Sequence, residues 1–251
     1  MNKAKVKKVL GIVLLCLVAG GYIGFVEKQN LSKAFRSIAI DLEAVSGVYF
    51  VEEKEILTIL SASFPELKKG LSMREIPLKD IEKRLLGHPF IRTVEASVDQ
   101  QGILKLSLTQ HEPMARIARP ETADGYITKE GLLIATSPSY TSRVLIIQGA
   151  YIGSLMDQGR LDAMPELIPL IRFISQDKFW SAQVTELEIN GRNDIRIHQQ
   201  VGKQVIEFGD AHDYESKFER IALLYKEILP RKGWDAYQRI SVKYKNQIVC
   251  E

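Results

Sequence analysis

Cysteine and histidine are scarce in this chain of 251 residues. The two cysteines, Cys16 and Cys250, stand near opposite ends of the sequence, so no disulfide framework is predicted. The four histidines are scattered, whereas a zinc site would need clustered histidine and cysteine. We therefore expect neither a bound metal nor a cofactor.

A basic excess is missing from most of the chain. The formal net charge is +3, and Lys3, Lys5, Lys7 and Lys8 all lie in the first eight residues. The remainder is close to neutral, whereas nucleic-acid-binding surfaces usually carry a strong basic excess. This charge balance argues against a nucleic-acid partner.

Motifs for catalysis are lacking as well. The sequence contains no Gly-x-Ser-x-Gly turn, no glycine-rich phosphate loop and no His-Glu-x-x-His. His111 and His198 are expected at the surface. Asp210, His212 and Asp213 stand close together but lead into a helix, whose first turn favours acids, so helix capping explains them. We therefore expect no enzyme and no small-molecule substrate.

One long uncharged run, residues 9–26, follows the N-terminal lysines. Its length as a helix is roughly 27 Å, close to a hydrocarbon core of about 30 Å. A cleaved signal peptide would have a shorter apolar region and a clean small-residue cleavage site, which Tyr22, Ile23 and Phe25 disturb. The sequence predicts a cytoplasmic tail over residues 1–8, an uncleaved transmembrane helix over 9–26 and a linker over 27–36. The bulk of the chain would lie outside the cytoplasm.

Apolar residues make up 45% of the chain, which supports a packed core. Residues 37–112 predict a strand–helix–helix–strand–strand unit with two layers. The last two strands of this unit form a hairpin whose tip is residues 99–102. The apolar positions assigned to the first strand and the two helices are Ile38, Ile40 and Leu42, then Ile56, Leu57, Leu60 and Phe64, then Leu78, Ile81, Leu85 and Leu86.

Glu112 and Pro113 follow the hairpin directly. Proline has no N–H to donate to a strand ladder, so this pair marks either a domain corner or a plain strand end. Residues 113–251 predict a second, β-rich domain with a helix through Leu170 and Ile174. An amphipathic helix ending at Pro230 and one long closing strand follow. In that strand Ile240, Val242 and Tyr244 would share a face.

Four stretches in this order carry a resemblance: LLGHPFIRTVEASV, LKLSLTQHEPMARI, GYITKEGLLI and RISVKYKNQIV. With the apolar N-terminal run, they resemble the FtsQ/DivIB family of bacterial cell-division proteins. The resemblance implies an α+β fold with a POTRA domain over 37–112 and an FtsQ-type domain over 113–251. Four residues depart from the family pattern. Gln110 stands where glutamate is usual, and His111 stands where a basic residue is usual. Ser241 replaces the usual aspartate, and Lys243 replaces the usual arginine.

The resemblance implies a single-pass scaffold of the divisome, in the cytoplasmic membrane at the division septum. It would link early and late division proteins and recruit partners of the FtsB and FtsL type. Other divisome proteins would contact the POTRA domain. In the family a partner adds a strand to the edge formed by the last strand. The implied contact residues are Arg239, Ile240, Val242, Lys243, Tyr244 and Lys245.

Alternatives remain open at this level. The closing strand could be a plain solvated edge that Lys243 and Lys245 protect from pairing. A single-POTRA component of outer-membrane protein assembly or secretion is a second function, although that class normally carries repeated units or a large barrel. A peptidoglycan-contacting anchor without a partner strand is a third.

Overall fold

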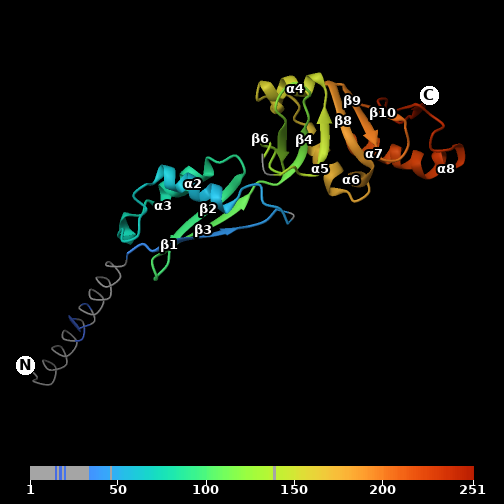
Figure 1. Ribbon diagram of the computed structural model, residues 1–251. Helices are drawn as coiled ribbons and strands as arrows, with labels where there is room; N and C mark the ends of the chain where they lie inside the picture. Colours follow the sequence, from blue (N-terminus) through green and yellow to red (C-terminus); the bar gives the residue numbers. More distant parts are fainter. Residues whose placement is uncertain (1–14, 16, 19, 21–33, 46, 138–139) are drawn as a thin grey trace, which may run out of the picture. The chain divides into compact units, whose positions relative to one another are not determined.

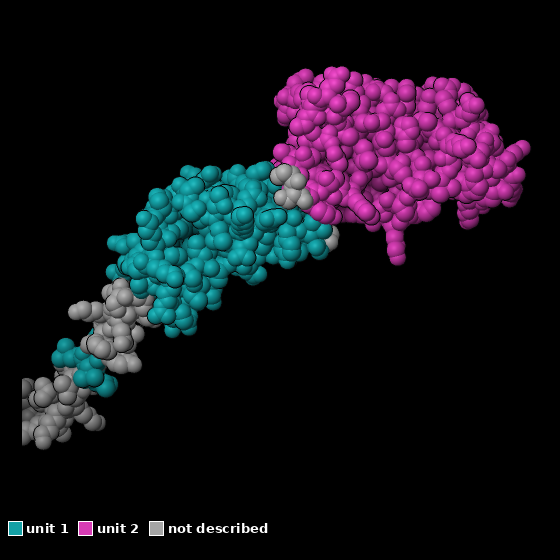
Figure 2. Space-filling view, viewed as in Figure 1, with its two compact units in different colours: residues 1–110 teal, residues 111–251 magenta. Residues whose placement is uncertain are grey.

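The computed structural model describes residues 15, 17–18, 20, 34–45, 47–137 and 140–251. The chain divides into two compact units, Met1–Gln110 and His111–Glu251, which Figure 2 colours separately. The predicted tail, membrane span and linker lie almost wholly outside the described residues. Across the residues that are described, no helix combines the length and the apolar character needed to cross a membrane.

Unit 1 is a three-stranded sheet with two helices on one side (Figure 1). The strand order is β1-β3-β2, with β3 parallel to β1 and antiparallel to β2. The predicted order of two helices and three strands is confirmed. The elements are β1 (Ser37–Leu42), α2 (Glu53–Ser63), a 3-10 turn η1 (Met73–Glu75), α3 (Leu78–Leu86), β2 (Ile91–Val98) and β3 (Ile103–Gln110).

The core of unit 1 follows from residue spacing. Ile56 and Leu60 on α2 and Ile81 and Leu85 on α3 are buried, as expected for residues on one helical face. The prediction was wrong for the neighbouring leucines. Leu57 is 38% exposed and Leu86 is 48% exposed, because each lies about 100° around the helix from the buried residue before it.

The tip of the β2–β3 hairpin depends on Asp99 and Gly102. The Asp99 carboxylate accepts hydrogen bonds from the backbone N–H of Ile103 at 3.0 Å and of Gln101 at 2.9 Å. These bonds, that of Ile103 most strongly, hold the pKa of Asp99 below its usual value. Gly102 has a φ of +83°, and a Cβ there would lie 2.2 Å from the carbonyl oxygen of Ala34. The turn therefore requires glycine at this position.

Gln110 closes unit 1 at the end of β3, and its side chain is buried. Its amide oxygen accepts the backbone N–H of Phe50 at 2.7 Å and of Val51 at 3.1 Å. Its amide nitrogen donates to the carbonyl of Glu43 at 2.9 Å. One side chain thus ties both ends of the segment between β1 and α2 to the last strand.

Unit 2 is built on one mixed sheet with the strand order β12-β11-β10-β9-β8-β7-β4-β5-β6 (Figure 1). Its first half comprises β4 (Pro113–Ile117), β5 (Gly125–Thr128), β6 (Leu133–Ala135), β7 (Leu145–Gln148), α4 (Ala150–Asp157), a 3-10 turn η2 (Leu161–Ala163), α5 (Leu167–Gln176) and α6 (Trp180–Gln183). Its second half comprises β8 (Val184–Gly191), β9 (Asp194–Gln199), β10 (Val205–Gly209), α7 (Tyr214–Leu223), a π-helical turn η3 (Leu224–Ile228), α8 (Leu229–Lys232), β11 (Arg239–Ser241) and β12 (Val249–Cys250).

A single hydrophobic core joins the sheet of unit 2 to its helices. Leu187, Ile195 and Ile206 from the strands share this core with Leu170 from α5 and Ile221 from α7. The helical stripes predicted for these two segments are confirmed. On β8, β9 and β10, polar residues such as Glu186, Arg196 and Glu207 alternate with the buried ones and lie on the other face of the sheet, which is partly exposed to solvent. β4 and β5 are buried almost throughout.

The structure of unit 2 differs from its sequence pattern at three places. The sequence pattern gave no sign of α4, which follows Gly149, where a Cβ would lie 2.3 Å from the carbonyl oxygen of Ile189. The helix expected to end at Pro230 continues to Lys232, because Pro230 lies in the first turn of α8, where no N–H is needed. β7 is almost wholly apolar, which is typical of a buried strand, but its Ile146 is 41% exposed.

Candidate functional site

The predicted contact residues lie on a short hairpin, not on one long strand. β11 covers only Arg239–Ser241, and the chain then turns through residues 244–246 and returns as β12. Asn246 has a φ of +59°, a left-handed conformation that asparagine tolerates better than most residues. The prediction of one long alternating strand was therefore wrong.

Burial separates the six predicted contact residues into two groups. Ile240 and Val242 are fully buried and belong to the core of unit 2. Tyr244 is 60% exposed, so it does not share their face as predicted. Arg239, Lys243 and Lys245 are also exposed. Only these four offer their side chains to a partner without unfolding of the hairpin.

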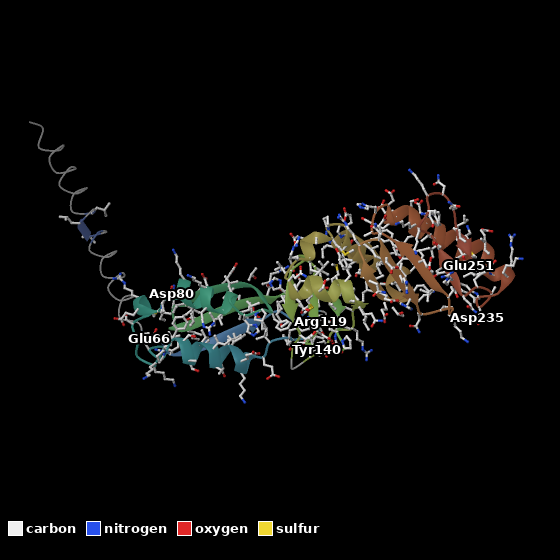
Figure 3. The ribbon with its side chains drawn as sticks, turned by 90° about the horizontal axis from the view of Figure 1, so that it is seen from above. Glu66, Asp80, Arg119, Tyr140, Asp235 and Glu251 are labelled. Atoms are coloured by element: carbon white, nitrogen blue, oxygen red, sulfur yellow. The ribbon has the colours of Figure 1, made fainter. Side chains whose placement is uncertain are left out.

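Glutamates form ion pairs with two of the exposed cationic side chains, Arg239 and Lys243. Glu207 on β10 lies 3.6 Å from Arg239 and 3.2 Å from Lys243. Arg239 also pairs with Glu251, which is labelled in Figure 3. The hydrogen bond to Glu251, and then the charges of Glu251 and Glu207, raise the pKa of the Arg239 guanidinium. Tyr244 and Lys245 have no ion pair among the described residues.

Arg220 on α7 holds the hairpin turn in place. Its guanidinium donates to the carbonyl oxygens of Val242 at 3.2 Å, of Gln247 at 2.7 Å and of Tyr244. The planar guanidinium can reach three acceptors that a single ammonium could not. Sequence reasoning missed Arg220, because its acceptors lie more than 20 residues away and an arginine on an amphipathic helix gives no local signal.

The outer strand of this hairpin leaves backbone groups open. Arg239 N–H donates to the carbonyl of Glu251 at 3.0 Å, and Glu251 N–H donates back at 2.9 Å. Bonded and non-bonded pairs alternate in an antiparallel ladder, so the N–H and C=O of Cys250, opposite Ile240, point away from β11. β12 ends the strand order of the described sheet, and β11 is paired on both sides. The edge is therefore β12, not the strand that carries Arg239.

Glu112 and Pro113 are remote from this hairpin in the sheet. Pro113 is the first residue of β4, a position where its missing N–H costs no ladder bond. Glu112 pairs with Lys129 at 2.5 Å. Four strands, β7 to β10, separate β4 from β11 in the strand order. The compact units divide between Gln110 and His111, directly before this pair.

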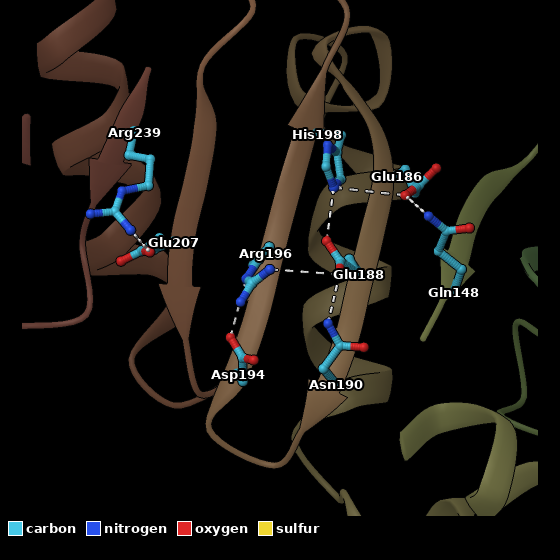
Figure 4. A network of polar contacts seen from close by, with 9 residues as sticks. All are labelled: Gln148, Glu186, Glu188, Asn190, Asp194, Arg196, His198, Glu207 and Arg239. Carbon is cyan, nitrogen blue, oxygen red and sulfur yellow. Dashed lines mark hydrogen bonds and ion pairs between the residues drawn. The ribbon is translucent and has the colours of Figure 1, made fainter. Parts of the chain in front are cut away.

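A polar network covers the solvent-facing side of β8 and β9, next to the hairpin (Figure 4). His198 lies 3.2 Å from Glu188 and 3.8 Å from Glu186. The hydrogen bond from Asn190, opposed by partial burial and aided by His198 and Arg196, lowers the pKa of Glu188. Each acid thus has a cationic or amide neighbour, and the arrangement serves as a solvated structural face. Among the described residues, no three His, Cys, Asp or Glu side chains gather as metal ligands.

Lys217, in the first turn of α7, is a buried lysine. The ammonium of Lys217 is 2.7 Å from the carboxylate of Asp210 and 4.9 Å from the centre of the Phe208 ring. Burial raises the pKa of Asp210, but the hydrogen bond and charge of Lys217 outweigh it, so this pKa is lowered. Asp213, at the start of α7, makes no side-chain capping bond, so the capping prediction was wrong there.

Replacing Lys217 with methionine should lower the free energy of unfolding of unit 2 by about 1 to 2 kcal/mol at pH 7, because Asp210 loses its charged partner while staying partly hydrated. Asp210 has a depressed pKa in the folded state, so its contribution is present above about pH 4 and is lost as pH falls through the folded pKa. The difference between wild type and variant should therefore shrink in acid. Urea unfolding followed by tryptophan fluorescence measures this, since Trp180 and Trp234 both lie in unit 2.

The exposed Lys226 on η3 supplies the control for this prediction. Lys226→Met should leave stability nearly unchanged at both pH values. Equal losses in the two variants, or a Lys217→Met loss that is the same in acid as at pH 7, would contradict the assignment of the Lys217–Asp210 pair.

Comparison with known proteins decides the family. A family model described as FtsQ/DivIB, C-terminal related, matches residues 112–251, more than half of the chain. The chain belongs to the FtsQ/DivIB family. A POTRA-like domain model matches residues 34–109, the region of unit 1. No curated protein gives a significant match to the chain.

FtsQ/DivIB membership confirms the resemblance seen in the sequence. It also confirms the mixed α+β architecture with a POTRA-like first unit. At the level of the family, the chain is a scaffold protein of cell division, and the two matched families are non-catalytic. FtsQ/DivIB proteins act through contacts with other division proteins.

Proposed function

We propose that this protein is a single-pass membrane scaffold of the bacterial divisome, located at the septum with its two folded units outside the cytoplasm. It links early and late division proteins and recruits partners of the FtsB and FtsL type. The uncharged run over residues 9–26, after four lysines, supports the anchor and its orientation. The POTRA-like unit contacts other division proteins.

The observation that carries partner recruitment is the C-terminal hairpin. β12 leaves the N–H and C=O of Cys250 open at the sheet edge, where an extended partner segment can add as a strand. Tyr244 stands exposed at the adjoining turn, and tyrosine contributes strongly to many protein interfaces. Arg239, Lys243 and Lys245 place positive charge around it. Ile240 and Val242 act only by holding the hairpin from the core.

Tyr244→Glu should weaken co-purification of the full chain with its host's FtsB- and FtsL-type proteins by about tenfold or more, because it removes an aromatic contact and adds a charge. Tyr49→Glu is the matched control, since Tyr49 is 51% exposed and lies in unit 1. Tryptophan fluorescence would verify that unit 2 stays folded. Undiminished capture by Tyr244→Glu would exclude this hairpin as the recruitment site.

Depletion of the protein in its own host separates the divisome role from a role in outer-membrane protein assembly or secretion. A divisome scaffold predicts long filaments without septa and with an intact envelope. Normal division with a leaky envelope or lost outer-membrane proteins would overturn the proposal.

A further inference from the structure

Three aromatic side chains of unit 2, Phe179, Tyr225 and Trp234, form a row. The ring centre of Tyr225 lies 6.1 Å from that of Phe179 and 5.6 Å from that of Trp234. The middle ring is buried, whereas Phe179 is 53% exposed and Trp234 is 39% exposed. The three residues come from the position before α6, from η3 and from the segment after α8. Exposed aromatic rings that share one buried neighbour are a common feature of binding surfaces.

The middle ring of this aromatic row is placed by an irregular helix. Tyr225 lies in η3, a π-helical turn, and such turns are rare and occur frequently at functional sites. Its hydroxyl donates to the side-chain oxygen of Gln199 at the end of β9. Burial raises the pKa of Tyr225 to about 12, so the hydroxyl stays a neutral donor at physiological pH. The aromatic row is thus joined to the segment between β9 and β10.

A buried amide without a partner lies in that segment. Gln204 is 2% exposed, and neither its side-chain nitrogen nor its side-chain oxygen has a hydrogen-bond partner among the described residues. Its backbone carbonyl accepts the side-chain N–H of Gln199 at 3.0 Å, so Gln199 links it to Tyr225. Its amide packs against Gly202, where a Cβ would lie 2.5 Å from the amide oxygen. Because buried polar groups are nearly always paired, this amide calls for a donor and an acceptor from outside the described residues.

The loop over Gln204, residues 200–203, adjoins the aromatic row. Its Gln200 N–H donates to the carbonyl of Gln183 at 2.7 Å, and the Gln183 side chain donates to the carbonyl of Val201 at 3.1 Å. Gln183 lies one helical turn after Phe179, to whose carbonyl it donates at 3.0 Å. Val201 is 49% exposed, so the loop adds an aliphatic side chain to this surface.

Basic side chains surround the aromatic row and the loop. An exposed lysine stands beside each of these segments in the sequence, and none of the four has an ion pair among the described residues: Lys178, Lys203, Lys226 and Lys232. Of the nearby acids, Glu227 pairs with Arg231, and Asp177 accepts the backbone N–H of Phe179 at 2.8 Å. Asp235, labelled in Figure 3, is an exposed carboxylate in the same region. Lysines therefore exceed free carboxylates, and the surface complements an acidic partner.

We propose that the aromatic row and the 200–203 loop bind an acidic segment of a partner protein. An apolar side chain of that segment lies over Tyr225, between Phe179 and Trp234, and its carboxylates lie beside the lysines. A peptide group offers one donor and one acceptor, as the amide of Gln204 requires, and a shift of the loop admits it. A lipid phosphate offers acceptors only, so the amide favours a peptide over a membrane surface.

This site goes beyond the recruitment proposed for the C-terminal hairpin. Trp234 precedes β11 and Tyr244 follows it, so the two surfaces lie toward opposite ends of that strand. The site depends neither on the hairpin nor on a membrane anchor.

The test selects peptides for binding to the full chain, held in detergent, from a random library displayed on phage. We expect enrichment of peptides that combine aspartate or glutamate with an aromatic or large aliphatic residue. The enrichment should disappear when Trp234→Ala protein is the target. An enriched peptide, synthesised free of the phage, should change the fluorescence of the exposed Trp234 ring, and calorimetry then gives its affinity for each variant.

Substitutions in and outside the surface locate the peptide. Phe179→Ala and Trp234→Ala should each weaken its binding at least about tenfold. Leu132→Ala is the matched control, because Leu132 is 50% exposed in the same unit, and it should leave the affinity unchanged. Lys226→Glu should weaken binding at least about threefold, since it repels an acidic peptide. Tyr244→Glu should have no effect, which separates this site from the hairpin.

Gln204→Met distinguishes a binding role of this residue from a purely structural one. Methionine is similarly long and carries no amide, so the urea midpoint of unit 2 should stay the same or rise. The peptide should nevertheless bind at least about threefold more weakly, because its peptide group loses the amide. Unchanged affinity would overturn the assignment of Gln204 to the site.

Other outcomes would overturn the whole proposal. These are selected peptides that are basic or that bind independently of Trp234, equal affinities for Trp234→Ala and Leu132→Ala, and loss of peptide binding in Tyr244→Glu. A further one is the absence of any selected peptide together with protection of Trp234 from an aqueous quencher in phosphatidylglycerol nanodiscs but not in phosphatidylcholine nanodiscs. That result would assign the surface to the membrane. Failure here with intact partner capture at the Tyr244 hairpin would leave the recruitment proposal standing.

Discussion

Replacing Arg220 with alanine should loosen the C-terminal hairpin and weaken capture of FtsB- and FtsL-type partners by at least about tenfold. The guanidinium donates to the carbonyls of Val242, Tyr244 and Gln247, on both sides of the turn. Hydrogen bonds from charged donors are the stronger kind, so their loss should lower the free energy of unfolding of unit 2 by about 2 to 3 kcal/mol. The measurements are co-purification and amide exchange over residues 242–247.

Two further substitutions sharpen this result. Arg220→Lys keeps the charge but cannot reach three carbonyls at once, so it should restore stability only in part. Arg231→Ala is the control, because the Arg231 side chain is 79% exposed and, among the described residues, its ion pair is with Glu227, one helical turn away. If Arg220→Ala left both partner capture and exchange at wild-type values, the hairpin would not depend on this anchor.

Replacing Gln110 with leucine should lower the free energy of unfolding of unit 1 by about 3 to 6 kcal/mol. The side chain is only 3% exposed, and it serves as acceptor for two backbone N–H groups and as donor to one carbonyl. Leucine has a similar size but offers none of these bonds, and buried backbone groups that lose their partners are costly. Unit 1 contains no tryptophan. Its unfolding would therefore be followed by amide exchange at Leu104 and Leu106.

Gln100 supplies the matched control for Gln110, because it is an exposed glutamine at the tip of the hairpin in the same unit. Gln100→Leu should change stability by less than about 0.5 kcal/mol. Gln110→Glu should fall between the two, since it keeps an acceptor but loses the donor to Glu43. A Gln110→Leu protein as stable as Gln100→Leu would show that the segment between β1 and α2 is held by other contacts.

Regular spacing of apolar residues allowed the elements of unit 1 to be predicted from its sequence. Alternation through Leu104, Leu106 and Leu108 and the 3.6-residue period through Ile81 and Leu85 gave the correct elements and most of the core. The same pattern could not show that β3 lies between β1 and β2, because strand order depends on which distant segments pair. The position of β1 at one edge of the described sheet follows from that order and so was not predictable.

The structure of the C-terminal hairpin could be predicted only in part from the sequence. Alternation located Ile240 and Val242 correctly as apolar positions, but it was extended through Tyr244, where the chain already leaves the strand. Asn246 was the local signal of a turn, since asparagine tolerates a positive φ. Arg220 and Glu207 reach the hairpin across the fold, and no local pattern in the sequence reports such contacts.

The parallel pairing of β10 with β11 has a consequence for how this protein fails under stress. The two strands are joined by the helical crossover α7–η3–α8, and the same crossover carries Arg220. Crossover and hairpin therefore depend on each other and can detach together from the sheet, as cooperative subdomains do in partial unfolding. Under the proposed function, mild heat or a protease that opens this subdomain would remove the recruitment hairpin. Because Ile221 of α7 belongs to the core that the whole sheet shares, the same opening would weaken the rest of unit 2 and expose the protein to further unfolding.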